Sequence, residues 1–88
     1  MAREIHLFYN SVMGVYLISN FKDLNRPREE FGELEKALSK LKSMVGKERK
    51  TNIIVYRGFK DEDVDNIAKN FRSYTNVNCV DDRGNKLK

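Results

Sequence analysis

Residues 51–80, TNIIVYRGFKDEDVDNIAKNFRSYTNVNCV, decide the fold. They open with three consecutive β-branched residues at 53–55, so that residues 51–56 predict a buried strand that Arg57 and Gly58 end. Residues 77–80 predict a short final strand. Because a helical segment separates the two strands, we expect them to be parallel and joined by a right-handed crossover.

The helix of this unit is indicated by apolar residues at spacings of three and four. We expect it to be capped by Asp61 and to stop near Thr75 and Asn76. Acidic residues in its first turns suit the positive end of the helix dipole. The stripe that faces the core is expected to consist of Val64, Ile67, Ala68 and Phe71.

A helix of about five turns is predicted from Arg26 onward. Asn25 is a plausible cap, Pro27 suits the first turn because its missing N–H costs nothing there, and Gly46 fits a left-handed position after the last turn. The basic run at residues 47–50 is then a loop. The apolar stripe consists of Phe31, Leu34, Leu38, Leu41 and Val45.

Residues 4–19 are rich in β-forming side chains that alternate over two runs, which predicts two strands. Asn10 and Ser11, followed by Met13 and Gly14, supply turn chemistry for a hairpin, and a single bulged strand is the alternative. Apolar and aromatic residues occupy both faces of these strands. One face therefore packs on helices while the other is covered differently or stays partly exposed.

These elements predict an α+β two-layer sandwich in the order β-β-α-β-α-β. Its four-stranded mixed sheet carries both helices on one face, and a three-layer arrangement with one helix on each face is the alternative. A length of 88 residues fits a single domain at 1–88. In the tail at about 83–88, Leu87 is expected either to pair back on the sheet or to fray.

The composition restricts the environment more than the activity. Charged residues make up 34% and the net charge is +4, which favours solubility without defining a dedicated polyanion surface. A single cysteine permits no internal disulfide, and no apolar segment has the length of a membrane span or the form of a signal peptide. A cytoplasmic protein is therefore expected.

Groups for enzymatic chemistry are few, so no catalytic residue, cofactor or metal is predicted. His6 lies within a predicted strand, and Cys79 has no flanking base, so both are interpreted as structural. A metal-dependent nuclease or phosphatase is a further alternative with less support, because aspartates are also common at helix starts and turns. It would use the acidic residues Asp61, Glu62, Asp63, Asp65, Asp81 and Asp82.

A nucleic-acid-binding protein is a stronger alternative. Residues 26–50 contain eight basic and five acidic residues, and residues 83–88 add three more basic ones. Such residues contact phosphates if the fold gathers them, although lysines late in a helix also complement its dipole. The candidate phosphate contacts are Lys36, Lys40, Lys47, Arg49, Lys50, Arg83, Lys86 and Lys88.

The leading hypothesis is a non-enzymatic interaction module, a small regulator or inhibitor. It binds another protein, or a second copy of itself as a homodimer, through a sheet face or edge. The two short helices can cover only part of the aromatic side chains, and exposed aromatic residues are common anchors at interfaces. The candidate anchors are Phe8, Tyr9, Tyr16, Phe21 and Tyr56.

Overall fold

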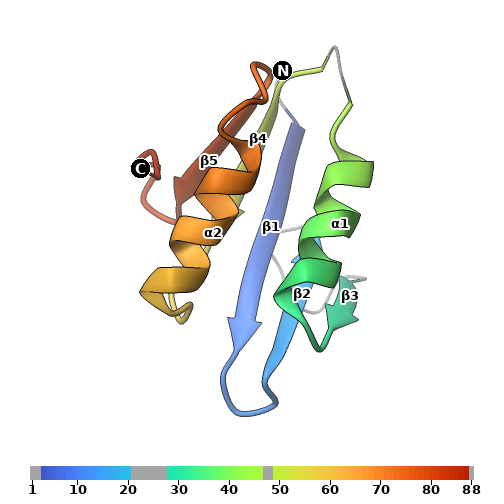
Figure 1. The fold of residues 1–88 in the computed structure, drawn as a ribbon, viewed down its shortest axis with the longest axis vertical. Coiled ribbons are helices and arrows are strands. Elements are labelled where there is room, and N and C mark those ends of the chain that lie inside the picture. The colour runs from blue at the N-terminus through green and yellow to red at the C-terminus, as the bar shows by residue number, and fades with distance from the viewer. Residues whose placement is uncertain (1–2, 21–27, 47–48, 88) are drawn as a thin grey trace.

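The computed structural model describes residues 3–20, 28–46 and 49–87. Five strands and two helices follow one another along this part of the chain (Figure 1). In chain order they are β1 (Arg3–Asn10), β2 (Val15–Ser19), β3 (Arg28–Phe31), α1 (Leu34–Met44), β4 (Thr51–Val55), α2 (Asp61–Phe71) and β5 (Val77–Asp81).

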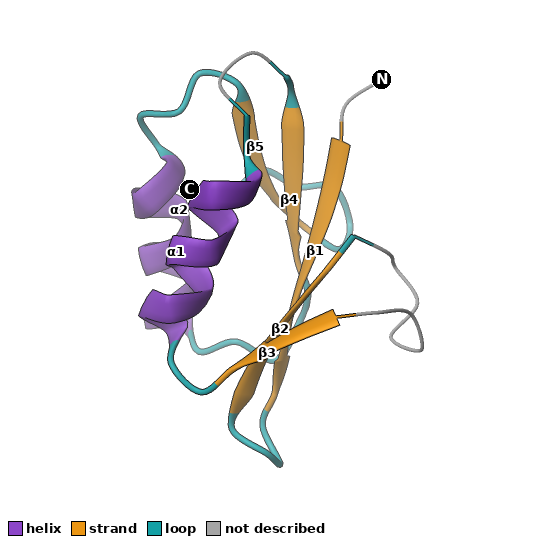
Figure 2. Cartoon of the chain, turned by 90° about the vertical axis from the view of Figure 1, so that its right-hand side faces the viewer, coloured by secondary structure: helices purple, strands orange, loops and turns teal. Residues whose placement is uncertain are grey.

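The strands form one mixed sheet in the order β3-β2-β1-β4-β5. β1 pairs in parallel with β4, and β4 in parallel with β5, while β2 is antiparallel to both β1 and β3. Both helices lie on the same side of this sheet (Figure 2). The predicted α+β class, the two layers and the parallel strands around α2 are therefore confirmed, and the three-layer alternative is wrong.

The core lies between the sheet and the helices. From the sheet come alternate residues of β1, β4 and β5, and from the helices most of the apolar residues predicted by their spacing, although Val64 is not among them. Within the described residues, neither helix combines the length and the apolar character that crossing a membrane requires. The central residues of this core are Ile5, Leu7, Ile18, Leu38, Leu41, Ile53, Ile67 and Phe71.

The prediction of four strands is wrong, because residues 28–31 form β3 instead of the start of a helix. α1 begins only at Leu34, and the proposed Asn25 cap and Pro27 lie outside the described residues. Phe31 lies opposite Tyr16 in the ladder between β2 and β3 and packs against the core. Its spacing of three from Leu34 fits a helix equally well, so the pattern alone could not exclude one.

Three details at the helix ends also differ from prediction. Lys60, and not Asp61, occupies the cap of α2, and this helix ends at Phe71, before Thr75. After α1 the backbone is extended at Val45 (φ −79°, ψ 126°), and Gly46 does not take the left-handed conformation. The chain enters the loop toward β4 directly, so no left-handed residue is required there.

The hairpin between β1 and β2 is confirmed, with the Asn10 side chain accepting hydrogen bonds from the backbone N–H groups of Val12 and Met13. Gly14 completes the turn at φ 68°. The C-terminal tail pairs back, because the backbone N–H of Leu87 donates to the carbonyl of Cys79 at 2.9 Å. This pairing is the first of the two alternatives predicted for Leu87.

Candidate functional site

The predicted aromatic anchors are divided between the two faces of the sheet. Strand alternation places Tyr9 and Tyr16 on the face that the helices cover, whereas Phe8 and Tyr56 lie on the opposite face. Phe21 lies outside the described residues. We call the face on which neither helix packs the helix-free face.

Tyr9 and Tyr16 belong to an aromatic cluster with Phe59 at one end of the core. Ring centroids in this cluster are 4.9 to 5.9 Å apart. The Tyr16 hydroxyl donates to Asp63 Oδ2 at 3.1 Å, which ties β2 to the start of α2. Burial, followed by this hydrogen bond, raises the pKa of Tyr16 above its ordinary value. These contacts give Tyr9 and Tyr16 a packing role.

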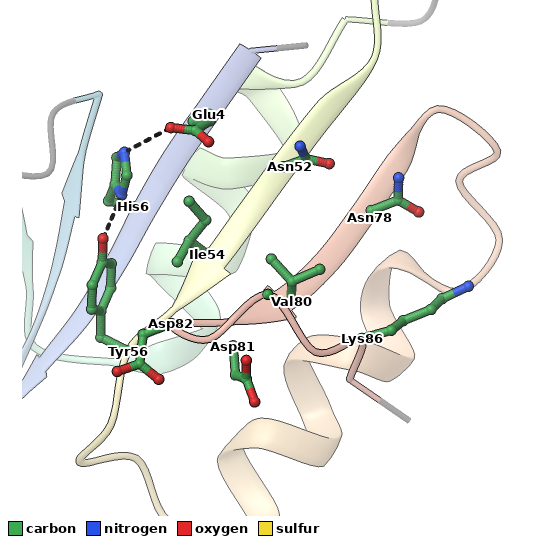
Figure 3. Close-up of a pocket in the computed structure, with 11 residues that line it drawn as sticks. Glu4, His6, Asn52, Ile54, Tyr56, Asn78, Val80, Asp81, Asp82 and Lys86 are labelled. Carbon is green, nitrogen blue, oxygen red and sulfur yellow. Dashed lines mark hydrogen bonds and ion pairs between the residues drawn. The ribbon is translucent and has the colours of Figure 1, made fainter.

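On the helix-free face the rings of Phe8 and Tyr56 stack, with centroids 4.2 Å apart and planes 18° from parallel. The Tyr56 hydroxyl shares a hydrogen bond of 2.8 Å with Nδ1 of the buried His6. Nε2 of His6 lies 3.8 Å from a carboxylate oxygen of Glu4. A polar chain of Glu4, His6 and Tyr56 therefore runs along the central strands (Figure 3).

Next to this chain lies a shallow hollow of about 460 Å³, which we call the face hollow. Its apolar floor comes from alternate residues of β4 and β5, because Ile54 and Val80 lie opposite each other in the parallel ladder. Asn52 and Asn78 form the pair before them. The residues that line the face hollow include Glu4, Asn52, Ile54, Tyr56, Asn78, Val80, Asp82 and Lys86.

The cysteine and the histidine lie on opposite faces of the sheet. Cys79 points into the helix-covered core, where burial raises the pKa of its thiol to about 11. His6 lies on the helix-free face against Tyr56. The two side chains therefore cannot act as a nucleophile and base pair, and the structural interpretation of Cys79 fits its surroundings.

The acidic residues do not converge on a metal site. Asp61, Asp63 and their neighbours begin α2, whereas Asp81 accepts hydrogen bonds from the backbone N–H groups of Asn85 and Arg83 at 2.8 and 2.9 Å. The bond from Asn85 contributes most to lowering the pKa of Asp81. Among the described residues, no three His, Cys, Asp or Glu side chains are grouped so as to hold a metal ion.

The structure does not gather all of the predicted phosphate contacts into one patch. Arg49 and Lys50 precede β4, whereas Arg83 follows β5, and these parallel strands place the two groups at opposite ends of the sheet. Lys36 and Lys40 lie on α1, where Lys40 Nζ is 3.5 Å from Glu29. The candidates Lys47 and Lys88 lie outside the described residues.

Sequence reasoning missed most of the face hollow, although a signal was present. Asn52, Ile54 and Tyr56 alternate with the core residues of β4, as Asn78 and Val80 do with those of β5. The run of β-branched residues at 53–55 suggested a strand buried on both faces, which concealed this alternation. Comparison with protein-family models, curated proteins and solved structures finds no significant match for this chain.

Proposed function

We propose that this chain is a non-enzymatic interaction module that binds a partner protein through the helix-free face of its sheet. The observation that carries the proposal is the stacked pair of Phe8 and Tyr56 beside the apolar floor of Ile54 and Val80. Interfaces are commonly anchored by aromatic residues around a small apolar pocket with a polar rim. A regulator or inhibitor is the kind of protein that this arrangement suits.

The sheet face suits this role better than the sheet edges. β3 is a short edge strand whose exposed residues Arg28, Glu29 and Glu30 are charged, which is a common device against strand addition. The opposite edge, at β5, is partly paired with the tail through Leu87. Neither edge therefore offers a long apolar strand to a partner.

Nucleic-acid binding has less support from the same surface. Aromatic rings on central strands can stack on bases, but the rim of the face hollow contains the carboxylates of Glu4 and Asp82. Carboxylates repel a phosphate backbone, and the basic residues at the two ends of β4 and β5 are too far apart to act as one patch. A protein partner avoids this conflict.

A catalytic role is also less well supported. The thiol of Cys79 is buried in the core, and its raised pKa keeps it protonated at neutral pH. Ser19 lies opposite His6 in the ladder between β1 and β2, but both residues are buried, and Tyr56 shares its hydroxyl with His6. The polar chain on this face therefore serves better to position Tyr56 than to activate a substrate.

Site-specific photo-crosslinking in the cells that make this protein tests the proposal. A benzophenone amino acid replaces Asn78, an exposed residue on the rim of the face hollow, and in a matched control it replaces Lys69, an exposed residue of α2. We expect a defined protein adduct from position 78 and none from position 69. Adducts with RNA or DNA at position 78, or protein adducts only at position 69, contradict the proposal.

A further inference from the structure

The face hollow has an acidic character that the chain as a whole lacks. The chain carries a net charge of +4, whereas the carboxylates of Glu4 and Asp82 line the hollow. Lys86 also contributes to the lining, but its side chain extends away from Glu4 and Asp82 (Figure 3). Asp81 is committed to the turn that follows β5. The hollow is therefore bordered by two carboxylates, Glu4 beside His6 at the Asn52 end and Asp82 beside Tyr56, where Asp82 is paired with Arg57.

The Tyr56 ring forms the aromatic wall of the hollow. One side of the ring stacks on Phe8, which does not line the hollow, so the hollow lies on the other side of Tyr56. The carboxylates of Glu4 and Asp82 are near enough that both add to the effect of burial in raising the pKa of the Tyr56 hydroxyl. An aromatic ring face with one carboxylate beside it and a second farther along the hollow is an arrangement that attracts cations.

Asp82 already accepts a guanidinium group within the molecule. Nε of Arg57 lies 3.4 Å from Oδ2 of Asp82. The Arg57 side chain is 69% exposed, whereas that of Asp82 is only 26% exposed. Because the Arg57 side chain is largely exposed, solvent screens this ion pair, and Arg57 can leave Asp82 to an incoming cation. The contact shows which type of group this carboxylate can pair with.

We propose that the face hollow binds an arginine side chain presented by the partner protein, an inference that rests on the proposed function. The planar guanidinium stacks on the free side of Tyr56 and pairs with Asp82, while its aliphatic stem lies on Ile54 and the more distant Glu4 adds long-range attraction. Arginine fits better than lysine because its delocalised planar group combines stacking with forked hydrogen bonds. Asn52 and Asn78 supply neutral donors and acceptors for the backbone of the bound segment.

An NMR titration of the full chain with two matched peptides tests this inference. The probe is acetyl-Gly-Arg-Gly-amide, and the control replaces its arginine with citrulline, which is neutral and almost the same shape. We expect the arginine peptide to shift the amide signals of residues 4–8, 52–56 and 78–82, with saturation at millimolar concentration. The citrulline peptide should bind about fivefold more weakly or worse. Equal binding of both peptides, or shifts confined to other residues, overturns the inference.

Variants of the chain assign the contacts. Asp82→Asn should weaken binding of the arginine peptide two- to fivefold, roughly the effect of one exposed charge pair, and Glu4→Gln should weaken it by less because Glu4 acts from a distance. Glu62→Gln, an exposed residue of α2, should leave it unchanged. Arg57→Gln should tighten binding, because it removes the internal competitor for Asp82. Unchanged affinity in Glu4→Gln, Asp82→Asn and Arg57→Gln overturns the inference, and a gain in Arg57→Gln cannot result from misfolding.

The aromatic contact has its own matched pair. Tyr56→Phe keeps the ring face and should bind the arginine peptide within about twofold of the parent chain, whereas Tyr56→Leu should lose most of the affinity.

The crosslinking experiment separates the two proposals. Protein adducts at position 78 combined with no preference for arginine over citrulline leave the interaction module standing and overturn arginine recognition. Protein adducts only at position 69 contradict the interaction module itself.

Discussion

Individual side chains in this protein acquire their roles from the face of the sheet on which they lie. All four aromatic candidates lie in or beside strands. Strand alternation directs Tyr9 and Tyr16 toward the helices, whereas Phe8 and Tyr56 point away from them. The sequence identifies all four as aromatic residues in or beside strands. It cannot assign them to faces without the register, which depends on pairing between strands distant in the chain.

The reactivity of the Cys79 thiol tests whether this side chain is buried in the core. Its thiol has a pKa of about 11, because burial disfavours the thiolate. At pH 8 the thiolate fraction is then about a hundredfold below that of a thiol with the ordinary value of 9.0. We expect Ellman's reagent to label the folded chain at least a hundredfold more slowly than the urea-unfolded chain. Comparable rates would show that Cys79 is not in the core.

The two tyrosines with raised pKa values predict how stability depends on pH. Tyr16 and Tyr56 both titrate above 10.0 in the folded chain, chiefly because of burial. The folded state therefore holds these protons more tightly, so their contribution is complete below pH 10 and is lost as the pH rises through the folded-state values. Urea unfolding at pH 8 and above pH 10 should show a smaller loss for the variant Tyr16→Phe/Tyr56→Phe than for the parent. An equal loss would mean that neither tyrosine is perturbed.

The hydrogen bond between Tyr16 and Asp63 has a separate consequence for stability at neutral pH. Tyr16→Phe removes this bond and should lower the free energy of unfolding by about 0.5 to 1 kcal/mol, because the group is only partly buried. Asp63→Asn provides a matched control, since an amide can still accept the bond and should cost less. Urea denaturation at pH 7 measures both values.

At the scale of elements, periodicity predicted α2 and four of the five strands, but it failed at β3. The residues Arg28, Glu29 and Glu30 show no apolar alternation, and Phe31 continues the helical spacing of α1. β3 forms because its backbone pairs with β2 and because Phe31 lies opposite Tyr16. Both reasons are tertiary contacts, which local sequence does not reveal.

Substitution of two glycines by alanine should change the stability of the fold in opposite directions. Gly58 has φ 112° after β4, and a Cβ there would lie 3.4 Å from the carbonyl oxygen of Tyr9, so Gly58→Ala should cost about 1 to 3 kcal/mol. Gly46 has no positive φ and open space around it, so Gly46→Ala should be neutral or stabilise by up to about 1 kcal/mol. Thermal and urea unfolding compare the two. A large cost at Gly46 would indicate that the left-handed conformation predicted from the sequence is the correct one.

At the scale of the whole molecule, the fold separates basic residues that the sequence analysis grouped together as candidate phosphate contacts. Parallel pairing puts Arg49 and Lys50 at one end of β4 and β5, and Arg83 at the other. The acidic rim of the face hollow lies between strands that are up to about 80 residues apart in sequence, from Glu4 to Asp82. Composition predicted the net charge, but the location of this rim depends on the sheet order, which the sequence left open.

This separation predicts weak binding to nucleic acids. Fluorescence anisotropy of labelled single- and double-stranded DNA and RNA should give affinities weaker than micromolar near physiological salt. The slope of log affinity against log salt should be shallower than about −3, because few phosphates are neutralised at once. Micromolar binding with a steeper slope, abolished by Arg49→Glu/Lys50→Glu, would support the nucleic-acid alternative instead.

The most direct measurement is the affinity of the partner protein for this chain. The partner found by crosslinking is purified, and titration calorimetry compares its binding to the parent chain, to Ile54→Lys and to Lys69→Glu. Ile54 lies half-buried on the floor of the face hollow, and a lysine there replaces the apolar floor with a positive charge, whereas Lys69 lies exposed on α2. Circular dichroism and urea unfolding establish that both variants fold. We predict a loss of affinity of about thirtyfold or more for Ile54→Lys, as for an interface hot spot, and a change within twofold for Lys69→Glu. Unchanged affinity in folded Ile54→Lys would contradict binding through the helix-free face.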